Sequence, residues 1–444
     1  MRARAKASAQ NQWAGAPSAL SVLSGHTVPA ITAISHSAAM QNPAPVPTDP
    51  LSSPSPCDLS ILIVAWNVRD LLRACLISIA RASRPVGGNS HLRHFGPSAA
   101  PPSGRMTGPP APPRGIGART ANLAAPVAPH APNLPNAPTL EVIVVDNASG
   151  DGTVAMLAND FPWVRVVANS ENLGFTRANN QAFAASRGAF VYFLNPDTEL
   201  LSGNLYGDSL HLLYEAVCTN ARVALAGPEL RYADNSLQSS ARRFPTPLTG
   251  FFESTWLARA WPRNPWARRL HMADWQMPFA HDVDWVVGAA MLARRSALLQ
   301  AMESSAQDAS VNTAVVPLRV PRYEGPFDEA FFMYSEEMDL CRRLKLLGWR
   351  ILYVPQARVI HMEGRSSEQA VAARHLNFNT SKVRYWRKWF GPRWSNRLRR
   401  YLLLEYRVQM TLERAKWLVG SKRPLRKQRI SAYKQVLASQ LRPR

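Results

Sequence analysis

The sequence contains few cysteines and no long apolar run. These two features argue against a disulfide-rich protein, a zinc protein and a protein that spans the membrane. The four cysteines among 444 residues are scattered, without a C-x-x-C pair or a histidine at metal-ligand spacing, which argues against a disulfide framework and a zinc site. No stretch approaches the ~18 to 20 continuous apolar residues that a membrane-spanning helix needs. We therefore expect reduced thiols and a cytoplasmic protein.

Acidic residues are scarce at the C-terminal end, which accounts for most of the formal net charge of +22. From Arg374 onward, about twenty Lys and Arg accompany only two acids, Glu405 and Glu413. Residues 381–410 interleave these cations with Trp, Tyr and Phe and become amphipathic. This basic region, 373–444, favours an anionic membrane surface, and it is equally typical of a helix packed against a neighbouring domain. Single-stranded nucleic acid also suits the composition, but no nucleic-acid module accompanies the charge.

Two segments lack hydrophobic periodicity. Residues 1–57 and 83–139 are rich in Ala, Ser and Pro, and we predict that both are disordered. The second one separates two strand-like apolar runs, 59–66 and 140–146, that belong to one pattern. A surface loop tolerates such an insertion because closure entropy grows slowly with loop length.

Apolar strands alternate with helical patterns in the rest of the chain. Uninterrupted apolar strands separated by helices indicate an α/β fold with a parallel sheet covered on both faces. A Trp- and Arg-rich stretch that ends near residue 283 is expected to be irregular. The predicted strands are 59–66, 140–146, 164–169, 189–195, 223–230 and 350–355. The predicted helices are 69–82, one within 149–161, 175–188, about 204–220, and one that follows Glu336 and stops at Gly348.

Charged side chains stand where several of these elements begin or end. Each has a bland explanation, because Asp forms turns, acids stabilise a helix start and a lone His is usually structural. Parallel topology, however, brings several strand ends to one rim, where α/β proteins bind ligands. The residues concerned are Asp146, Asp197, Glu336, Glu337, Asp339 and His361.

A rim with carboxylates and an imidazole suits a hard divalent cation, Mg²⁺ or Mn²⁺, that carries a diphosphate. The cation would neutralise a leaving nucleotide diphosphate, and a separate carboxylate would take the proton from an attacking hydroxyl. This division of labour is that of a sugar transfer with inversion.

The chain also resembles a known family in a set of ordered motifs. These are ILIVAWN, VIVVDNASGDGT, NLGFTRANNQA, YFLNPDTEL, VDWVVGAAMLARRS and FFMYSEEMDLCRRLKLLGWRILYVPQARVIH. Together they resemble the family 2 inverting glycosyltransferases with the GT-A fold, and most of all their bacterial rhamnosyltransferase-like branch, over roughly 59–82 and 139–390. The resemblance implies a Rossmann-like, mixed and mainly parallel sheet within 58–372, followed by a basic helical extension.

The resemblance also implies roles for individual residues. Glu337 would be the catalytic base, flanked by Glu336 and Asp339. Asp197 and His361 would contact the metal, and Trp285 and Gly288 would line the acceptor side. The nucleotide-sugar site would consist of Ala65, Trp66, Asn67, Asp146, Asn147, Asn172, Gly174, Asn180, Asn195 and Asp197.

The sequence departs from the family pattern at three points. Asn195 replaces one carboxylate of the D-x-D element, which implies a weaker or differently filled metal site. The base is Glu rather than Asp, which leaves open whether Glu336 or Glu337 acts. The motif "VAWN" replaces the commoner Ser-Tyr beside the nucleotide base.

The implied function is transfer of a sugar, with rhamnose as the candidate, from a nucleotide diphosphate to a polyprenyl-linked or polysaccharide hydroxyl in cell-surface glycan synthesis. The implied location is the cytoplasm, with the inner face of the membrane as a peripheral docking site. A non-catalytic, membrane-associated scaffold with a degenerate fold stays open as the alternative, because of the changes at Asn195 and Glu337.

Overall fold

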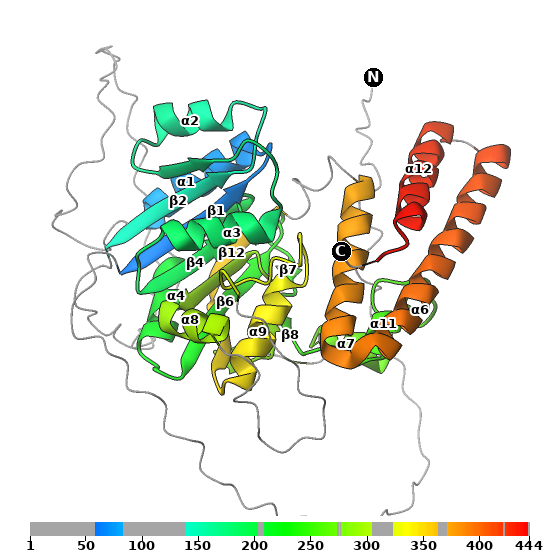
Figure 1. The fold of residues 1–444 in the computed structure, drawn as a ribbon. Helices are drawn as coiled ribbons and strands as arrows, with labels where there is room; N and C mark the ends of the chain where they lie inside the picture. The colour runs from blue at the N-terminus through cyan, green and yellow to red at the C-terminus, as the bar shows by residue number, and fades with distance from the viewer. Residues whose placement is uncertain are drawn as a thin grey trace, which may run out of the picture. The chain divides into compact units, whose positions relative to one another are not determined.

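A mixed β-sheet with parallel central strands forms the middle of the fold (Figure 1). The computed structural model describes residues 58–82, 139–202, 208–272, 275, 277–303, 323–362, 371–420 and 422–442. The segments predicted to be disordered, 1–57 and 83–139, lie outside these residues apart from Thr139.

The main sheet has the strand order β3-β2-β1-β4-β11-β6-β12-β5. Strands β1 to β4 are parallel, and β6 is parallel to β12, whereas β11 runs antiparallel to β4 and β6, and β5 antiparallel to β12. The short strands β7 and β9 pair with β6 and β12, and β8 pairs with β10 in a separate sheet. The bounds are β1 Leu59–Ala65, β2 Leu140–Asp146, β3 Arg165–Ala168, β4 Phe190–Leu194, β5 Thr198–Leu200, β6 Val223–Arg231, β7 Leu237–Gln238, β8 Ala241–Arg242, β9 His281–Asp282, β10 Trp285–Val286, β11 Ala290–Arg294 and β12 Arg350–His361.

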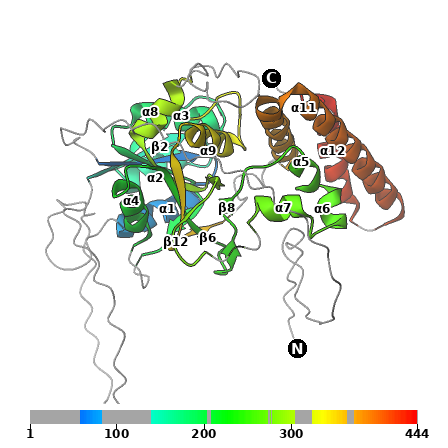
Figure 2. The ribbon, with the colours of Figure 1, turned by 90° about the horizontal axis from the view of Figure 1, so that it is seen from below.

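Helices cover both faces of this sheet (Figure 2). Alternate residues of β1 point to opposite faces, so Leu59, Ile61 and Ile63 join the core under α1, α2 and α4, while Leu62 and Val64 join the core under α3, α8 and α9. The bounds are α1 Arg69–Ala82, α2 Thr153–Asp160, α3 Phe175–Ala185, α4 Ser209–Cys218, α5 Thr249–Phe252, α6 Trp256–Ala260, α7 Pro265–Leu270, α8 Arg295–Glu303, α9 Glu336–Leu346, α11 Val371–Val419 and α12 Arg423–Ser439.

Most sequence-predicted elements are present, with four differences. The helix predicted at 175–188 ends at Ala185, because Ser186 is extended and its amide donates to the Phe183 carbonyl. The strand predicted at 350–355 continues to His361, through an irregularity between Val354 and Arg358, because its second half pairs with β5 and β6. The stretch expected to be irregular contains short helices and strands that tertiary packing holds in place. The helix predicted at about 204–220 begins at Ser209, and residues 203–207 lie outside the described residues.

The C-terminal region consists of two helices, α11 and α12, that share a hydrophobic core with the loop before α9. Helix α11 kinks at Gly391, where φ is 83° and Pro392 follows. The aromatic residues before the kink point inward: Tyr385 and Trp386 are buried with Phe331 and Met338. Packing against the rest of the protein is therefore what occupies these aromatic side chains.

No helix within the described ranges combines the length and the apolar character needed to cross a membrane.

Candidate active site

The carboxyl ends of β1, β2 and β4 lie side by side at one edge of the sheet. Ala65 pairs with Asp146 at the ends of β1 and β2, and the Asn147 amide donates to the Ala65 carbonyl at 2.8 Å. Strand β4 runs parallel on the other side of β1, with Leu194 opposite Ile63, so the turn of Asn195 to Asp197 follows at the same edge. The strand ends predicted to meet therefore do meet.

Asp146 and Asn147 are both 2% exposed at this edge. Asp146 Oδ2 accepts a hydrogen bond from the Ser149 amide at 3.0 Å, while Oδ1 is buried without a hydrogen-bond partner. A buried carboxylate oxygen without a donor costs free energy unless a ligand supplies one. Asp146 therefore has one oxygen that can accept a hydrogen bond from a ligand.

The Asn147 side chain organises the loop that precedes α3. Its amide nitrogen donates to Asn172 Oδ1 at 2.9 Å and to the Gly174 carbonyl at 3.2 Å, and its oxygen accepts from the Leu173 amide at 3.1 Å. All of its polar capacity is used inside the protein, so Asn147 shapes the pocket wall. Asn172 is exposed beside it.

On the opposite side of this edge, Asp197 and His361 form a buried pair. His361 Nε2 lies 3.5 Å from Asp197 Oδ1, and the two side chains are 8% and 6% exposed. The other ring nitrogen, Nδ1, is 3.1 Å from Gln238 Oε1. In the tautomer that donates Nδ1–H to Gln238, the lone pair of Nε2 faces the carboxylate, which is how second-shell groups orient a metal-binding imidazole.

Asn195 stands two residues before Asp197 and retains an unused oxygen. Its Oδ1 is buried without a hydrogen-bond partner, while its backbone amide donates to the Ala289 carbonyl at 2.8 Å. An amide oxygen is a normal ligand of hard divalent cations. The replacement of a carboxylate by Asn195 thus removes a charge and keeps an oxygen ligand.

Glu336 and Glu337 open α9 after an unusual backbone turn. Tyr334 and Ser335 have φ values of 71° and 69°, a left-handed conformation that is costly for residues other than glycine. Burial and the neighbouring Glu337 carboxylate raise the pKa of Glu336 well above its ordinary value. Burial also raises the pKa of Glu337, although backbone amides and the Arg242 cation oppose this shift.

Gly288 brings Glu337 to the same edge as Asp197. A Cβ added at Gly288 would lie 3.4 Å from the Glu337 Cβ and Cγ, so the glutamate packs directly on this glycine. The next residue, Ala289, accepts the hydrogen bond from Asn195. The loop before α9 is also tied to α3, since the Phe332 carbonyl accepts from the Phe175 amide at 2.9 Å. The candidate base and the turn that carries Asn195 and Asp197 are therefore both linked to the segment Gly288–Ala289.

Besides Asn147, three more of the sequence-predicted residues have structural partners instead of open positions. Asn180 clamps Phe327, donating to its carbonyl at 2.9 Å and accepting from its amide at 3.1 Å. Asp339 is 0% exposed, and its carboxylate binds Arg343, Lys388 and Trp389. Trp285 donates its indole N–H to the Arg243 carbonyl at 3.0 Å.

Arg242 and Arg243 lie near the site, but the sequence analysis did not identify them as candidates. The Arg242 cation lies 6.0 Å from the Trp285 ring centre and acts on Glu337 through its charge. Arg243 pairs with Asp284, with 3.0 Å between Nη1 and Oδ1. The consecutive cations in "SSARRF" were the only available signal, and they stand in the stretch expected to be irregular.

Comparison with known proteins decides the family. Residues 132–294 match the family model "Glycosyl transferase family 2". The chain is 30% identical over 296 residues to the N-acetylglucosaminyl-diphospho-decaprenol L-rhamnosyltransferase of Mycobacterium tuberculosis, a match that covers 62% of this chain and 86% of that protein. The chain belongs to glycosyltransferase family 2. As a member, this glycosyltransferase has the GT-A fold expected from its motifs, with the mainly parallel sheet described above.

Other similar proteins cover less of the chain or share less sequence. Rhamnosyltransferase WbbL of Escherichia coli K12 is 29% identical over 201 residues, which is 42% of this chain and 60% of that protein. GalNAc-T7 in a complex with UDP, GalNAc and Mn²⁺ gives a TM-score of 0.39 at 12% identity, over 69% of this chain and 43% of that one. Mannosyltransferase PcManGT of Pyrobaculum calidifontis, in a complex with GDP-Man and Mn²⁺, gives 0.38 at 14% identity, over 88% and 89%. At these scores neither structure assigns a role to a residue here.

The site offers a partial set of donor atoms for a divalent cation. Within the described part of the chain, no group of three or more His, Cys, Asp and Glu side chains is arranged to hold a metal ion. Asp197, the imidazole of His361 and the unsatisfied oxygen of Asn195 offer a partial set. Mg²⁺ and Mn²⁺ are commonly held by one or two protein carboxylates together with phosphate oxygens and water.

Proposed function

We propose that this glycosyltransferase moves a sugar, with rhamnose as the first candidate, from a nucleotide diphosphate to a hydroxyl of a lipid-linked or polysaccharide acceptor, with inversion at the anomeric carbon. The relatives from M. tuberculosis and E. coli, both rhamnosyltransferases by name, support the sugar, and the decaprenol-linked acceptor in the first name supports the lipid. We place this reaction in cell-surface glycan synthesis at the cytoplasmic face of the membrane.

The main observation behind this proposal is that Glu337 packs next to the edge of the sheet on which Asp197 lies. A transferase of this kind needs a group that stabilises the leaving diphosphate and a base on the other side of the sugar. Asn195 links the two, because its amide binds Ala289 next to the Gly288–Glu337 contact.

The donor would bind along the ends of β1 and β2. Ala65, Trp66 and Asn67 line the first strand end, and Asp146 has a buried oxygen that can accept a hydrogen bond from the nucleotide. Asn67 is held with φ 52° by hydrogen bonds to Ser149 and Gly150, so the loop is preorganised before a nucleotide arrives. Preorganisation reduces the entropy lost on binding.

Glu337 would act as the base. Its carboxylate would take the proton of the acceptor hydroxyl while that oxygen forms a bond to the anomeric carbon and the bond to the diphosphate breaks. The raised pKa of Glu337 favours this role, because a stronger base accepts a proton more readily. Asp339 would keep α9 in place instead, since its oxygens already bind Arg343, Lys388 and Trp389.

A bound divalent cation would neutralise charge on the leaving diphosphate, and Asp197, His361 and Asn195 would hold it. The Gln238 contact would keep the His361 ring oriented towards Asp197. Trp285 and Gly288 would form the acceptor side, next to Arg242.

A transfer assay tests the function. The protein is incubated with Mn²⁺, a panel of nucleotide diphosphate sugars, and N-acetylglucosaminyl diphosphate carried on a prenyl chain, and the product is analysed by mass spectrometry and NMR. We expect a glycosylated lipid product with one donor, and an anomeric configuration opposite to that of the donor. Retention of configuration would contradict the inverting mechanism, and the lack of product with every donor would contradict the function.

A further inference from the structure

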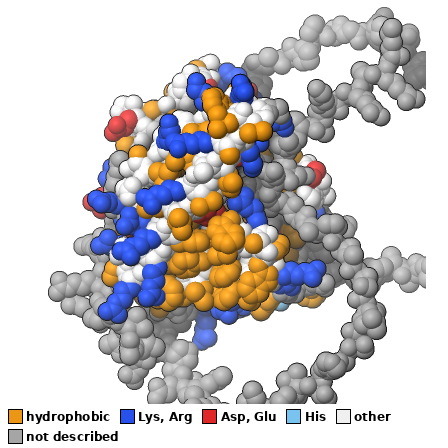
Figure 3. Space-filling model, turned by 90° about the vertical axis from the view of Figure 1, so that its right-hand side faces the viewer, with side chains coloured by type: hydrophobic (Ala, Val, Ile, Leu, Met, Phe, Trp, Pro, Cys, Tyr) orange, Lys and Arg blue, Asp and Glu red, His pale blue; other side chains and the backbone are white. Residues whose placement is uncertain are grey.

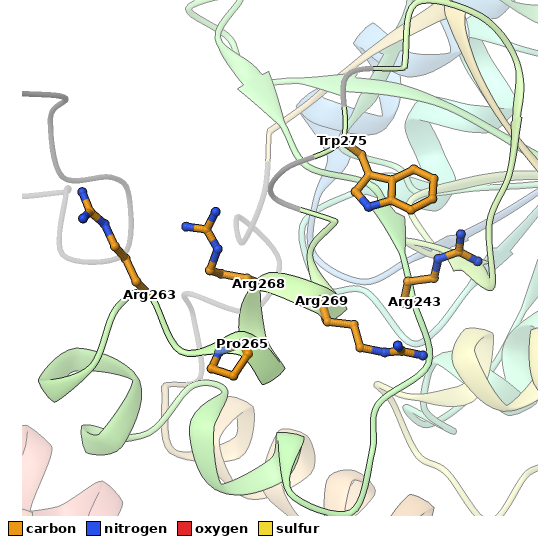
Figure 4. Close-up of a pocket in the computed structure, with 6 residues that line it drawn as sticks. All are labelled: Arg243, Arg263, Pro265, Arg268, Arg269 and Trp275. Carbon is orange, nitrogen blue, oxygen red and sulfur yellow. The ribbon is translucent and has the colours of Figure 1, made fainter. Parts of the chain in front are cut away.

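Four arginines surround a pocket of about 420 Å³ outside the site described above (Figure 4). Arg243 follows β8, Arg263 lies between α6 and α7, and Arg268 and Arg269 belong to α7. Pro265 and the exposed Trp275 complete the lining. A pocket of this size is large enough for a phosphate-containing group.

The sequence concentrates positive charge here. Residues 254–273 contain no Asp or Glu, although they include Arg263, Arg268 and Arg269. No ion pair with a described acid involves Arg263 or Arg269. Arg243 is held between Asp284, at 3.0 Å, and the Trp275 ring, whose centre is 4.9 Å from its guanidinium carbon. Arg263 and Arg269 thus carry positive charge that a bound anion can offset.

Guanidinium groups favour diphosphate over a single carboxylate. Each presents a planar fork of N–H donors that matches two phosphate oxygens. Figure 4 shows Arg243, Arg263 and the α7 pair Arg268 and Arg269 around the pocket, with their guanidinium groups pointing in different directions. A diphosphate, with two charged groups and several oxygens, could bridge neighbouring arginines after their side chains rotate.

The pocket is connected to the acceptor side of the active site through Arg243. Its amide donates to the Leu270 carbonyl of α7 at 3.0 Å, and its carbonyl accepts from the Trp285 indole at 3.0 Å. Trp285 begins β10, and Gly288, which contacts Glu337, follows two residues after that strand. The donor residues Asp146 and Asn147 belong to other strand ends, so the pocket is separate from the nucleotide side.

Exposed apolar side chains lie in the same structural region as the arginines. Trp261 is 49% exposed and stands in the same short loop as Arg263. Trp256, at the start of α6, donates its backbone amide to Glu405 of α11. Leu404, Val408 and Leu412 are exposed at helical spacing along α11. Figure 3 shows apolar side chains gathered on this side of the molecule with Lys and Arg around them.

We propose that Arg243, Arg263, Arg268 and Arg269 bind the diphosphate of a prenyl diphosphate-linked acceptor, whose apolar chain runs over Trp261 and Trp256. This inference rests on the proposed function. It assigns the acceptor a binding site of its own, and it explains why cations and exposed tryptophans occur together between Trp256 and Leu270.

Direct binding of farnesyl diphosphate to the full chain tests the pocket without any sugar transfer. We expect calorimetric titration to show binding of farnesyl diphosphate, competition by inorganic diphosphate, and weaker binding of farnesol. In the double variant Arg263→Ala/Arg269→Ala the dissociation constant should rise about 10- to 100-fold, because charge-assisted hydrogen bonds to phosphate are lost. Arg407→Ala, which removes an exposed α11 cation outside the pocket, should change it by less than about twofold.

Several outcomes would contradict the proposal that this pocket binds a prenyl diphosphate. Equal affinity in the double variant and the wild type would do so, as would binding of farnesol as tight as that of the diphosphate. An equal loss in Arg407→Ala would show that overall charge is responsible. A double variant that loses binding to phosphatidylglycerol vesicles but keeps farnesyl diphosphate would assign these arginines to the membrane instead.

The experiments distinguish an error in the proposed acceptor-binding pocket from an error in the proposed function. If the double variant transfers sugar with an unchanged acceptor KM, the proposed binding of the acceptor in this pocket is wrong. The proposed function as a glycosyltransferase would still hold. Binding of farnesyl diphosphate that depends on Arg263 and Arg269, without transfer from any donor, would support the pocket and contradict the function.

Discussion

Glu336 and Glu337 are adjacent in the chain but differ in their surroundings. Glu336 is 4% exposed, and burial together with the Glu337 carboxylate favours its protonated acid. Glu337 is half-buried, packs on Gly288 and is influenced by Arg242, which favours its ionised form relative to Glu336. The question that the sequence left open, which of the two acts as base, is thus answered in favour of Glu337 as a proposal.

Substitution of each glutamate by glutamine separates their roles. Glu337→Gln should lower kcat about 10²- to 10⁴-fold, because the amide cannot take the acceptor proton. Glu336→Gln should retain most of the activity, since glutamine resembles the neutral acid in shape and hydrogen bonding. Initial rates of transfer, with circular dichroism as a check on folding, provide the measurement. Similar losses in the two variants would contradict the assignment.

Gly174 has a backbone conformation and a close contact that both exclude a side chain. Its φ is 88°, and an added Cβ would lie 2.6 Å from Phe332 Cδ2 and 2.8 Å from the Phe332 carbonyl oxygen. Gly348 has a similar φ of 84° but nothing within 4 Å of an added Cβ. The two glycines therefore form a matched pair, with backbone strain common to both and steric overlap confined to Gly174.

Alanine at the two positions should have unequal effects. Gly348→Ala should lower the free energy of unfolding by about 1 kcal/mol through backbone strain alone. Gly174→Ala should lower it by about 2 kcal/mol more and should reduce transfer, because Phe332 and the loop before Glu336 must move. Urea denaturation of both variants measures the difference. Equal losses would show that the Phe332 contact is not tight.

Some residues could be given only a candidate role from the sequence. Acids at a helix start are stabilised by the helix dipole, so Asp339 looked like Glu336 and Glu337. Its binding to Lys388 depends on a segment that follows about fifty residues later in the chain. Asn180 likewise stands in a motif of nucleotide-binding appearance, but its amide holds Phe327. Long-range partners of this kind leave no local pattern.

At the element scale, α11 acts as a support for α9 and for the segment around α5. Lys388 and Trp389 bind Asp339, and Lys382 Nζ lies 2.7 Å from Glu253 Oε2. Burial alone would raise the pKa of Glu253, but the Lys382 cation outweighs it and lowers this pKa to about 2. The C-terminal helices thus contribute to the position of α9.

Removal of Lys382 should therefore destabilise the protein in a pH-dependent way. Because the folded pKa of Glu253 is about 2 and its ordinary value is 4.5, the pair contributes stability above pH 4.5 that is lost as the pH falls towards 2. Lys382→Met should cost about 3 kcal/mol at pH 7 and progressively less below pH 4.5. Lys382→Met/Glu253→Gln should recover most of the loss. A cost that does not vary with pH would contradict the pairing.

The elements themselves were predictable to different degrees. The bounds of β1, α1 and β2 agree with the sequence within one residue, because a continuous apolar run and a helical spacing are local signals. The antiparallel direction of β11 and β5 was not predicted strand by strand, since a buried strand has the same composition in either direction. The short elements between 232 and 283 depend on packing and gave no periodic signal.

At the scale of the whole molecule, three kinds of contact position the residues of the candidate site. The parallel strand order places Asp146 and Asp197 at one edge, the Asn195–Ala289 bond adds Gly288 and Glu337, and the Phe332–Phe175 bond closes the loop over α3. The family resemblance predicted this convergence, and the topology places the strand ends that carry Asp146 and Asp197 at one edge of the sheet; that the side chains form one site stays a prediction. Their individual roles stay predictions, as do the domain limits 58–372 and 373–444.

The scaffold alternative makes a different prediction at this scale. A non-catalytic protein would keep the fold and the C-terminal helices without any need for a cation at Asp197. Metal-dependent binding of the donor therefore separates the two interpretations.

Calorimetric titration of nucleotide diphosphate sugars, with and without Mn²⁺, tests the central claim most directly. We expect the wild-type protein to bind one donor at least about tenfold more tightly with Mn²⁺, and Asp197→Ala to lose this gain while Glu303→Ala, at an exposed position on α8, retains it. Donor binding that is the same with and without the cation, or that keeps its Mn²⁺ dependence in Asp197→Ala, would contradict the proposal that Asp197 and His361 hold a cation on the leaving diphosphate.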